Sequence, residues 1–271
     1  MNLEAKTFYE RAGLKYAEFQ ERRYLKFSNL FDEVSWLQFS AWLPAERGAR
    51  ILDAGCGGGG WSLRLATLGY RNLTLVDFSS TCIEGARAIF RRHGLERCGR
   101  FLVADLADLR ELADGEFDFV LCERDPLEYC VDDQDRAFAE LVRVLRDGAV
   151  LTLSAGTAYR RRQALLRDRR FPEFLEFVRT GVCASEEGPL RPLDRARILD
   201  LFAREGVEKL CIAGRLTLCD LLDETGHDLV YADAELKAKL LQLEMEHQAQ
   251  EDLADGSSHI FAAGRKRRRS S

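Results

Sequence analysis

Short apolar runs alternate with segments of helical periodicity from residue 50 onward. Each run is four to six residues long and ends in, or directly precedes, an acidic or turn residue. A segment with apolar residues three or four positions apart then follows. This alternation is typical of β-α units that build a parallel sheet. The predicted strands cover residues 50–53, 73–77, 101–105, 117–122 and 149–154.

Helical spacing predicts the elements around and between these strands. Two helices are expected before the first strand, over residues 8–19 and 28–43. Between strands, helices are predicted over residues 60–69, 81–94 and 135–146, and Thr81 with Glu84 forms a predicted capping box. Beyond Ser154 the pattern is looser and predicts helices over 158–178, 193–205 and 234–251 and strands over 209–213 and 258–263.

A glycine-rich turn follows the first predicted strand. Gly55, Gly57 and Gly60 satisfy the G-x-G-x-x-G pattern of dinucleotide sites. Such a turn lets a ligand approach backbone N–H groups and the positive end of a helix dipole. Asp53 precedes the first glycine by two residues, and its carboxylate would repel a pyrophosphate lying beside it. The turn therefore predicts a nucleotide cofactor, and Asp53 favours a cationic one.

Acidic residues end, or directly follow, the first four predicted strands: Asp53, Asp77, Asp105 and Glu123. Ligands of open α/β sheets bind outside the carboxyl ends of the strands, so a ligand there meets several carboxylates. No Lys or Arg accompanies them at these strand ends before Arg124. Ribose hydroxyls, an exocyclic amine and positive charge suit this environment, and S-adenosylmethionine carries all three.

The motifs resemble, in order, those of class I S-adenosylmethionine-dependent methyltransferases. Residues 52–59, LDAGCGGG, are similar to the family's D/E-x-G-x-G-x-G motif. Residues 75–79, 103–106 and 117–123 resemble its second, third and fourth strands. Residues 138–151 resemble its following helix, turn and fifth strand, with Asp147 and Ala149 replacing a proline and a glycine, and residues 258–266 resemble its last strand.

The resemblance implies a Rossmann-like α/β fold. In such a fold a seven-stranded, mostly parallel sheet has its last strand antiparallel and helices on both faces. Residues 1–47 would form a helical N-terminal cap and residues 48–264 the methyltransferase domain. Within that domain, residues 157–190 would be an inserted lid, and residues 265–271 would be a basic tail.

The resemblance also implies roles for individual residues. Asp77 would hold the ribose hydroxyls, Asp105 would accept from the adenine amine, and Asp53 would bind the ammonium group. Phe78 and Leu106 would pack on the adenine. The other predicted cofactor-binding residues lie in three places. The turn supplies Gly55, Cys56, Gly57 and Gly59, the end of the fourth strand supplies Glu123, and Tyr16 would cover the cofactor.

The loop after the fourth strand supplies acceptor-side candidates. Methyltransferases that act on nucleobase or glutamine nitrogens often carry an Asn/Asp-Pro-Pro-Tyr tetrapeptide directly at this strand end. Here Asp125-Pro126 comes two residues later, which weakens the case for those acceptors. Arg124 is expected to pair with Asp125 or Asp132, or to neutralise an acidic substrate. Tyr129 and His227 are the candidate catalytic residues, although in-line methyl transfer mainly requires alignment and needs a general base only for a protonated acceptor.

Composition narrows the partners. The formal net charge of −5 does not favour attraction to nucleic acid or to an anionic membrane. No apolar run approaches the ~18 residues of a membrane span, and the N-terminus lacks a signal-peptide pattern. We expect a cytoplasmic protein with neither partner, and interpret the arginines of residues 160–170 as a solvated helix face. The eight cysteines lack metal-binding spacing, so no metal site is expected.

The predicted function is methyl transfer from S-adenosylmethionine to an oxygen, nitrogen or sulfur atom of a small molecule. Two alternatives stay open. One is a methyltransferase for RNA or protein, and the other is a non-catalytic scaffold that binds S-adenosylmethionine. The sequence indicates neither the acceptor nor the oligomeric state.

Overall fold

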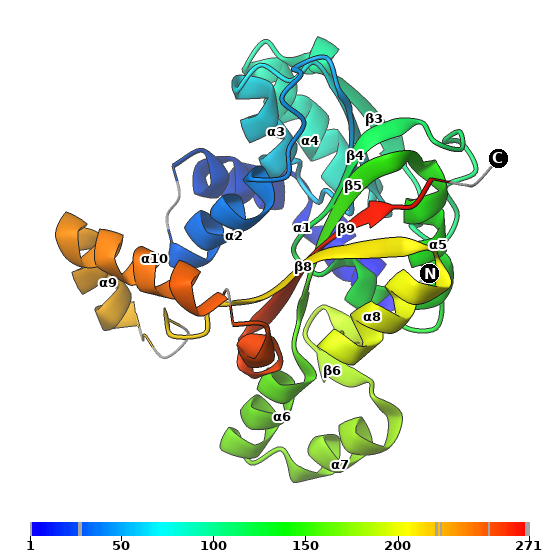
Figure 1. The fold of residues 1–271 in the computed structure, drawn as a ribbon. Helices are drawn as coiled ribbons and strands as arrows, with labels where there is room; N and C mark the ends of the chain where they lie inside the picture. Colours follow the sequence, from blue (N-terminus) through cyan, green and yellow to red (C-terminus); the bar gives the residue numbers. More distant parts are fainter. Residues whose placement is uncertain (1, 27–28, 220–221, 223, 249, 269–271) are drawn as a thin grey trace.

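The centre of the protein is a seven-stranded sheet, seen in a computed structural model that describes residues 2–26, 29–219, 222, 224–248 and 250–268 (Figure 1). Its strands are β1 (Arg50–Ala54), β2 (Asn72–Asp77), β3 (Gly99–Val103), β4 (Phe117–Cys122), β5 (Leu145–Gly156), β8 (Val207–Arg215) and β9 (His259–Lys266). The order is β3-β2-β1-β4-β5-β9-β8. Strands β1 to β5 pair in parallel, and β9 is antiparallel to both neighbours. The predicted sheet is confirmed.

Alternate residues of the central strands pack into two hydrophobic cores. The helices are α1 (Leu3–Lys26), α2 (Leu30–Ser40), α3 (Gly60–Thr67), α4 (Ser80–Arg92), α5 (Gln134–Val144), α6 (Ala158–Arg167), α7 (Phe171–Thr180), α8 (Arg195–Arg204), α9 (Glu224–Ala232) and α10 (Ala234–Gln248). Leu52 and Val120 share a core with α5 and α8, whereas Ile51 and Phe119 share one with α3 and α4. Because successive strand side chains point to opposite faces, helices cover both faces, as predicted.

Local chemistry moves several predicted boundaries. The predicted capping box at Thr81 is wrong, because α4 is capped by Ser79, whose Oγ accepts from the Cys82 N–H at 3.2 Å. The helix predicted over residues 158–178 is two helices, separated where Arg169 adopts a φ of 57°. Strand β9 continues through Lys266, whose Nζ donates to the Leu145 carbonyl at 2.7 Å. Residues 265–266 therefore lie in the sheet rather than in a tail.

The N-terminal helices and the segment after β5 meet over the carboxyl edge of the sheet. Helix α1 lies on the glycine turn, since a Cβ added at Gly58 would be 2.3 Å from the Cα of Ala17. After α7 the chain forms a small hairpin, β6 (Cys183–Ser185) and β7 (Gly188–Leu190). Asn2 Nδ2 donates to the Pro189 carbonyl at 2.6 Å, so this segment touches the N-terminal cap. Among the helices described, none has the length and hydropathy needed to cross a membrane.

Candidate cofactor and acceptor site

A cavity lies at the carboxyl ends of β1, β2 and β4, beneath α1. Of the eleven residues predicted to bind the cofactor, ten line it: Tyr16, Asp53, Gly55, Cys56, Gly57, Asp77, Phe78, Asp105, Leu106 and Glu123. They come from five separate stretches of the chain. The fold therefore brings together residues that the sequence connected only through their order and position at strand ends.

Backbone geometry at the turn requires glycine at two positions. Gly55 and Gly57 have φ values of 75° and 52°, in the left-handed region. A Cβ at Gly55 would be 2.3 Å from the Cβ of Pro126, and one at Gly57 would be 2.9 Å from Cε1 of Tyr16. Both glycines therefore let neighbouring groups approach the turn closely from the cavity side.

Gly59 has a different position from the one predicted. It does not line the cavity but caps α3, with a φ of 75°. A Cβ there would be 2.8 Å from Cδ2 of Leu75 and 2.9 Å from the Cβ of Ala86. Gly59 therefore allows α3 to pack closely on β2 and α4, and we assign it to helix packing instead of cofactor contact.

Two buried carboxylates, Asp53 and Asp77, face the cavity. Asp53 is 3% exposed and accepts from Ser62 Oγ at 2.7 Å. Asp77 is 6% exposed and accepts from the backbone N–H groups of Gly57 and Ser79 at 2.8 and 2.9 Å. No ion pair among the described residues involves either acid. Burial raises the pKa of Asp53 to about 7 and that of Asp77 to about 6. A cationic ligand would relieve this desolvation, whereas a pyrophosphate would aggravate it.

The adenine-side residues lie after β2 and β3. Phe78 follows Asp77 directly, and its ring centroid is 6.1 Å from that of Tyr9 on α1. Asp105 Oδ1 accepts from the Ala107 N–H at 3.0 Å, which holds the loop after β3. Leu106 is buried beside it and lines the same cavity.

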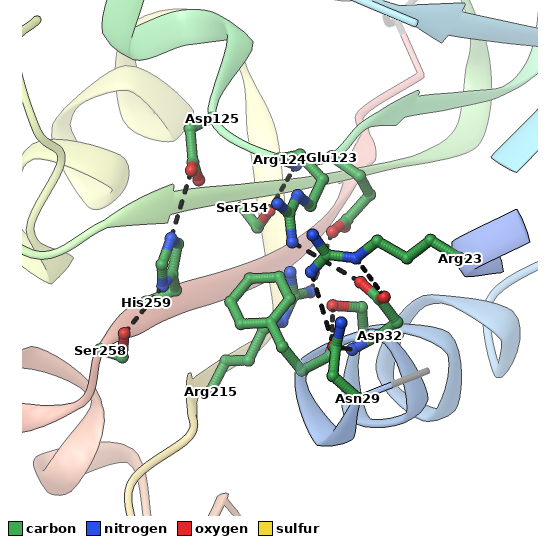
Figure 2. A network of polar contacts seen from close by, with 12 residues as sticks. Arg23, Asn29, Asp32, Glu123, Arg124, Asp125, Ser154, Arg215, Ser258 and His259 are labelled. Carbon is green, nitrogen blue, oxygen red and sulfur yellow. Dashed lines mark hydrogen bonds and ion pairs between the residues drawn. The ribbon is translucent and has the colours of Figure 1, made fainter. Parts of the chain in front are cut away.

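Glu123 differs from the other acids because it is already paired. Its Oε2 lies 2.9 Å from Nη2 of Arg215, and both side chains are fully buried (Figure 2). Arg215 Nε donates to Gln38 Oε1 at 2.7 Å. The expectation considered only cations that precede Arg124 in the chain, and the partner of Glu123 comes after it. Arg215 is the last residue of β8 and lies two residues beyond the predicted strand 209–213, so the sequence did not connect it with Glu123.

Arg124 also has a partner that the sequence did not indicate. Its Nη1 lies 3.6 Å from Oδ1 of Asp32, which also pairs with Arg23, and its guanidinium lies 4.6 Å from the centre of the Phe31 ring (Figure 2). The predicted partners Asp125 and Asp132 are wrong. Arg124 also lines the cavity. Among the described lining residues it is the one lysine or arginine, and it belongs to the loop after β4.

The loop after β4 is strained where it leaves the strand. Arg124 and Asp125 have backbone φ values of 69° and 72°, which residues other than glycine rarely adopt. The Arg124 N–H donates to Ser154 Oγ at 3.0 Å, and Asp125 Oδ2 lies 3.2 Å from His259 Nε2. These contacts from β5 and β9 hold the loop against Gly55, at the side of the cavity where Pro126 lies.

The structure describes the side chain of one candidate catalytic residue, Tyr129, but not that of the other, His227. Tyr129 lines the cavity, and its hydroxyl is 3.2 Å from that of Tyr9. Burial raises the pKa of Tyr129 well above its ordinary value, which favours a neutral hydrogen-bonding group over a base. His227 belongs to α9, and its side chain lies outside the described part of the chain.

Sequence reasoning missed two lining residues of α1. Gln20 Oε1 accepts from the Gly60 N–H at 3.4 Å, and the Tyr24 ring stacks on Trp61 with centroids 4.1 Å apart. Both line the cavity. Tyr16, Gln20 and Tyr24 are spaced four residues apart, so once Tyr16 was identified the helical period could have found the others.

Comparison with known proteins adds to this geometry. Residues 51–148 match a family model described as a methyltransferase domain. Residues 51–148 therefore belong to a methyltransferase domain, with the fold of S-adenosylmethionine-dependent methyltransferases. A geranyl diphosphate methyltransferase solved in complex with S-adenosylmethionine shares this fold, with a TM-score of 0.54 at 17% identity, covering 87% of this chain and 85% of that one.

Relatives match the methyltransferase domain over part of their length. A malonyl-[acyl-carrier protein] O-methyltransferase from Pectobacterium atrosepticum is 32% identical over 157 residues, covering 55% of this chain and 58% of the relative. A ubiquinone biosynthesis O-methyltransferase from Xanthomonas oryzae pv. oryzae is 37% identical over 109 residues, covering 40% and 43%. The chain thus spans about half the length of the curated relatives it matches.

A solved structure extends the fold similarity beyond the matched segment. An S-adenosylmethionine-dependent methyltransferase from Methanosarcina mazei superimposes with a TM-score of 0.60 at 20% identity, covering 86% of this chain and 98% of that one. At this identity the similarity concerns the fold, and it includes most of the sheet described above.

Proposed function

We propose that the protein transfers a methyl group from S-adenosylmethionine to a nucleophilic oxygen, nitrogen or sulfur atom of a small molecule. The observation that carries the proposal is the pair Asp53 and Asp77, two buried carboxylates that form no ion pair with a described residue and lie beside a glycine-rich turn. An adjacent cation stabilises such carboxylates. The donor set therefore fits a ligand with positive charge and hydroxyl groups.

Within this proposal each lining residue has a distinct task. Asp77 would accept from the ribose hydroxyls, Asp105 from the adenine amine, and Asp53 would stabilise the ammonium group. Phe78 and Leu106 would contact the adenine faces. When bound, S-adenosylmethionine supplies a methyl group activated by the charge on its sulfur. The chain then has to align an acceptor and exclude water.

Helix α1 and the loop after β4 are placed for that task. Tyr16 lies against Gly57, and Pro126 lies against Gly55, so both sides of the turn are shielded. Tyr9 and Tyr129 bring two hydroxyl groups to the same cavity. Their hydrogen-bonding hydroxyls would orient an acceptor, and neither is needed as a base. Several matched relatives bear the name O-methyltransferase, which favours oxygen as the methylated atom.

The test is formation of S-adenosylhomocysteine with small acceptors. Purified protein would be incubated with S-adenosylmethionine and, separately, with phenols, carboxylic acids, amines and thiols. We expect turnover with at least one oxygen acceptor, and its loss in Asp77→Ala. The exposed Asp252→Ala serves as a matched control and should retain activity. Turnover restricted to RNA or protein would contradict the proposal, as would tight cofactor binding without turnover of any acceptor.

A further inference from the structure

Helix α7 carries large apolar side chains on two sides. On its inner side, Phe177 is 3% exposed and packs with Phe174 in a small core that includes Leu165 of α6. On its outer side, Phe171, Leu175 and Val178 are 54%, 66% and 55% exposed. A helix that is apolar all round is usually buried on all sides. Within the described chain, however, the outer side of α7 faces solvent.

The three exposed side chains form one stripe. Their spacing of four and three residues places them on the same side of the helix. Helix α6 adds Tyr159 and Leu166, which are 48% and 45% exposed and lie seven residues apart on one face of that helix. Figure 1 shows α6 and α7 extending away from the sheet at the bottom of the view. The stripe is thus on a projecting part of the molecule, not in a groove.

The same hairpin carries positive charge in an acidic protein. Residues 158–180 hold seven arginines and three acidic residues, whereas the whole chain has a formal net charge of −5. Each of the three acids pairs with a neighbouring arginine, in the pairs Arg167–Asp168, Arg170–Glu173 and Arg179–Glu176. The acids are therefore paired within the hairpin, and the segment has four more arginines than acids, of which Arg161 pairs with Glu128 outside it.

We propose that the α6–α7 hairpin binds the surface of an anionic lipid bilayer, with Phe171, Leu175 and Val178 inserted among the acyl chains. Short helices that combine an exposed apolar stripe with arginines adsorb to such surfaces in this way. A bilayer accommodates a projecting stripe, whereas a protein partner would need a matching groove. The expectation of no membrane partner considered only net charge and spanning segments, and surface adsorption requires neither a basic protein nor a long apolar run.

Adsorption would place the bilayer beside the acceptor side of the cavity. Helix α6 begins two residues after β5 ends, and Arg161 Nη2 lies 3.6 Å from Oε2 of Glu128 in the loop after β4. A lipophilic acceptor could then enter from the bilayer. This consequence rests on the proposed function, whereas binding of the hairpin to the bilayer does not.

Co-sedimentation with vesicles tests the proposal without cofactor or turnover. Vesicles of phosphatidylcholine alone would be compared with vesicles that also contain phosphatidylglycerol. We expect binding to the anionic vesicles, weakened by added salt because headgroup attraction is screened. In the triple variant Phe171→Ser/Leu175→Ser/Val178→Ser the partition coefficient should fall by about tenfold or more.

A matched control distinguishes insertion of the α7 side chains from non-specific adsorption through any exposed apolar side chain. Leu229→Ser/Leu236→Ser removes apolar side chains that are 63% and 41% exposed on α9 and α10, and should leave vesicle binding unchanged. Absence of binding to anionic vesicles would overturn the proposal, as would equal losses in both variants. Dimerisation abolished by the triple substitution, without vesicle binding, would instead assign the stripe to a second copy of the chain. Failure of vesicle binding would leave the methyl-transfer assay unaffected.

Discussion

Replacing Arg215 with methionine should destabilise the protein strongly. The substitution keeps an unbranched side chain but removes the cation that pairs with Glu123 at 2.9 Å, where both side chains are fully buried. It also removes the hydrogen bond to Gln38 at 2.7 Å. Breaking a buried ion pair on one side typically costs about 3–5 kcal/mol, because the remaining charge lacks both water and a partner. In a chain of this size that corresponds to a fall in Tm of roughly 6–20 °C.

The stability loss caused by Arg215→Met should depend on pH. Burial raises the pKa of Glu123 even with Arg215 present, and removing Arg215 raises it further. The folded variant would then bind a proton more tightly than the unfolded chain. Its stability deficit relative to the native protein should therefore grow as pH rises from the raised pKa of Glu123 in the native protein toward the still higher pKa in the variant. Deficits measured at pH 5 and pH 8 should differ, with the larger one at pH 8.

Urea unfolding followed by tryptophan fluorescence would measure these differences. The control is Arg265→Met, because Arg265 lies 4.0 Å from Glu208 with both side chains about half exposed; it should cost less than about 1 kcal/mol. Adding Glu123→Gln to Arg215→Met should restore at least about 2 kcal/mol, since it removes the unpaired charge. If Arg215→Met costs no more than the control, or if the double variant is no more stable than the single one, the reasoning is refuted.

Two further predictions concern the turn and its acids. Gly57→Ala should weaken S-adenosylmethionine binding by about tenfold or more in calorimetry, because its φ of 52° and the 2.9 Å approach to Tyr16 both disfavour a Cβ; Gly48→Ala, with open space around it, should not. In the cofactor-free protein, burial raises the pKa of Asp53 from 3.8 to about 7, so folding favours its protonated form and stability is lost as pH rises through this range. The free energy of unfolding of Asp53→Asn relative to that of the native protein should therefore increase between pH 5 and pH 8, by no more than about 3 kcal/mol, since about two pH units lie between pH 5 and this pKa. A constant difference would contradict this account.

The sequence predicted the parallel sheet and most of the cavity because both depend on local order. Apolar runs that end in acids, such as the one at Asp77, place those acids at one edge of any parallel sheet. Contacts between distant segments could not be predicted in the same way. Arg215 lies 92 residues from Glu123, and the Asp32 partner of Arg124 comes from a helix that precedes the whole sheet. Such pairs depend on how α2 and β8 pack, which periodicity does not encode.

Gly59 and the α7 stripe illustrate a second limit. Within the glycine turn, the pattern of five glycines in residues 55–60 does not distinguish those that face a ligand from one that lets α3 pack on β2. In α7, the apolar residues 171, 174, 175, 177 and 178 are compatible with a buried helix, and only the fold shows which of them face solvent. In both cases the sequence shows which residue types are present, but it does not show which face of the element each residue occupies.

The most direct test of the central claim is calorimetric titration of the cofactor-free protein with S-adenosylmethionine and, separately, with NADH. The account predicts that S-adenosylmethionine binds and NADH does not. It also predicts that a folded Asp77→Ala variant loses at least about tenfold in affinity for S-adenosylmethionine, because the buried carboxylate of Asp77 forms no ion pair with any described residue. NADH binding of equal or greater strength, or unchanged affinity in Asp77→Ala, would contradict it.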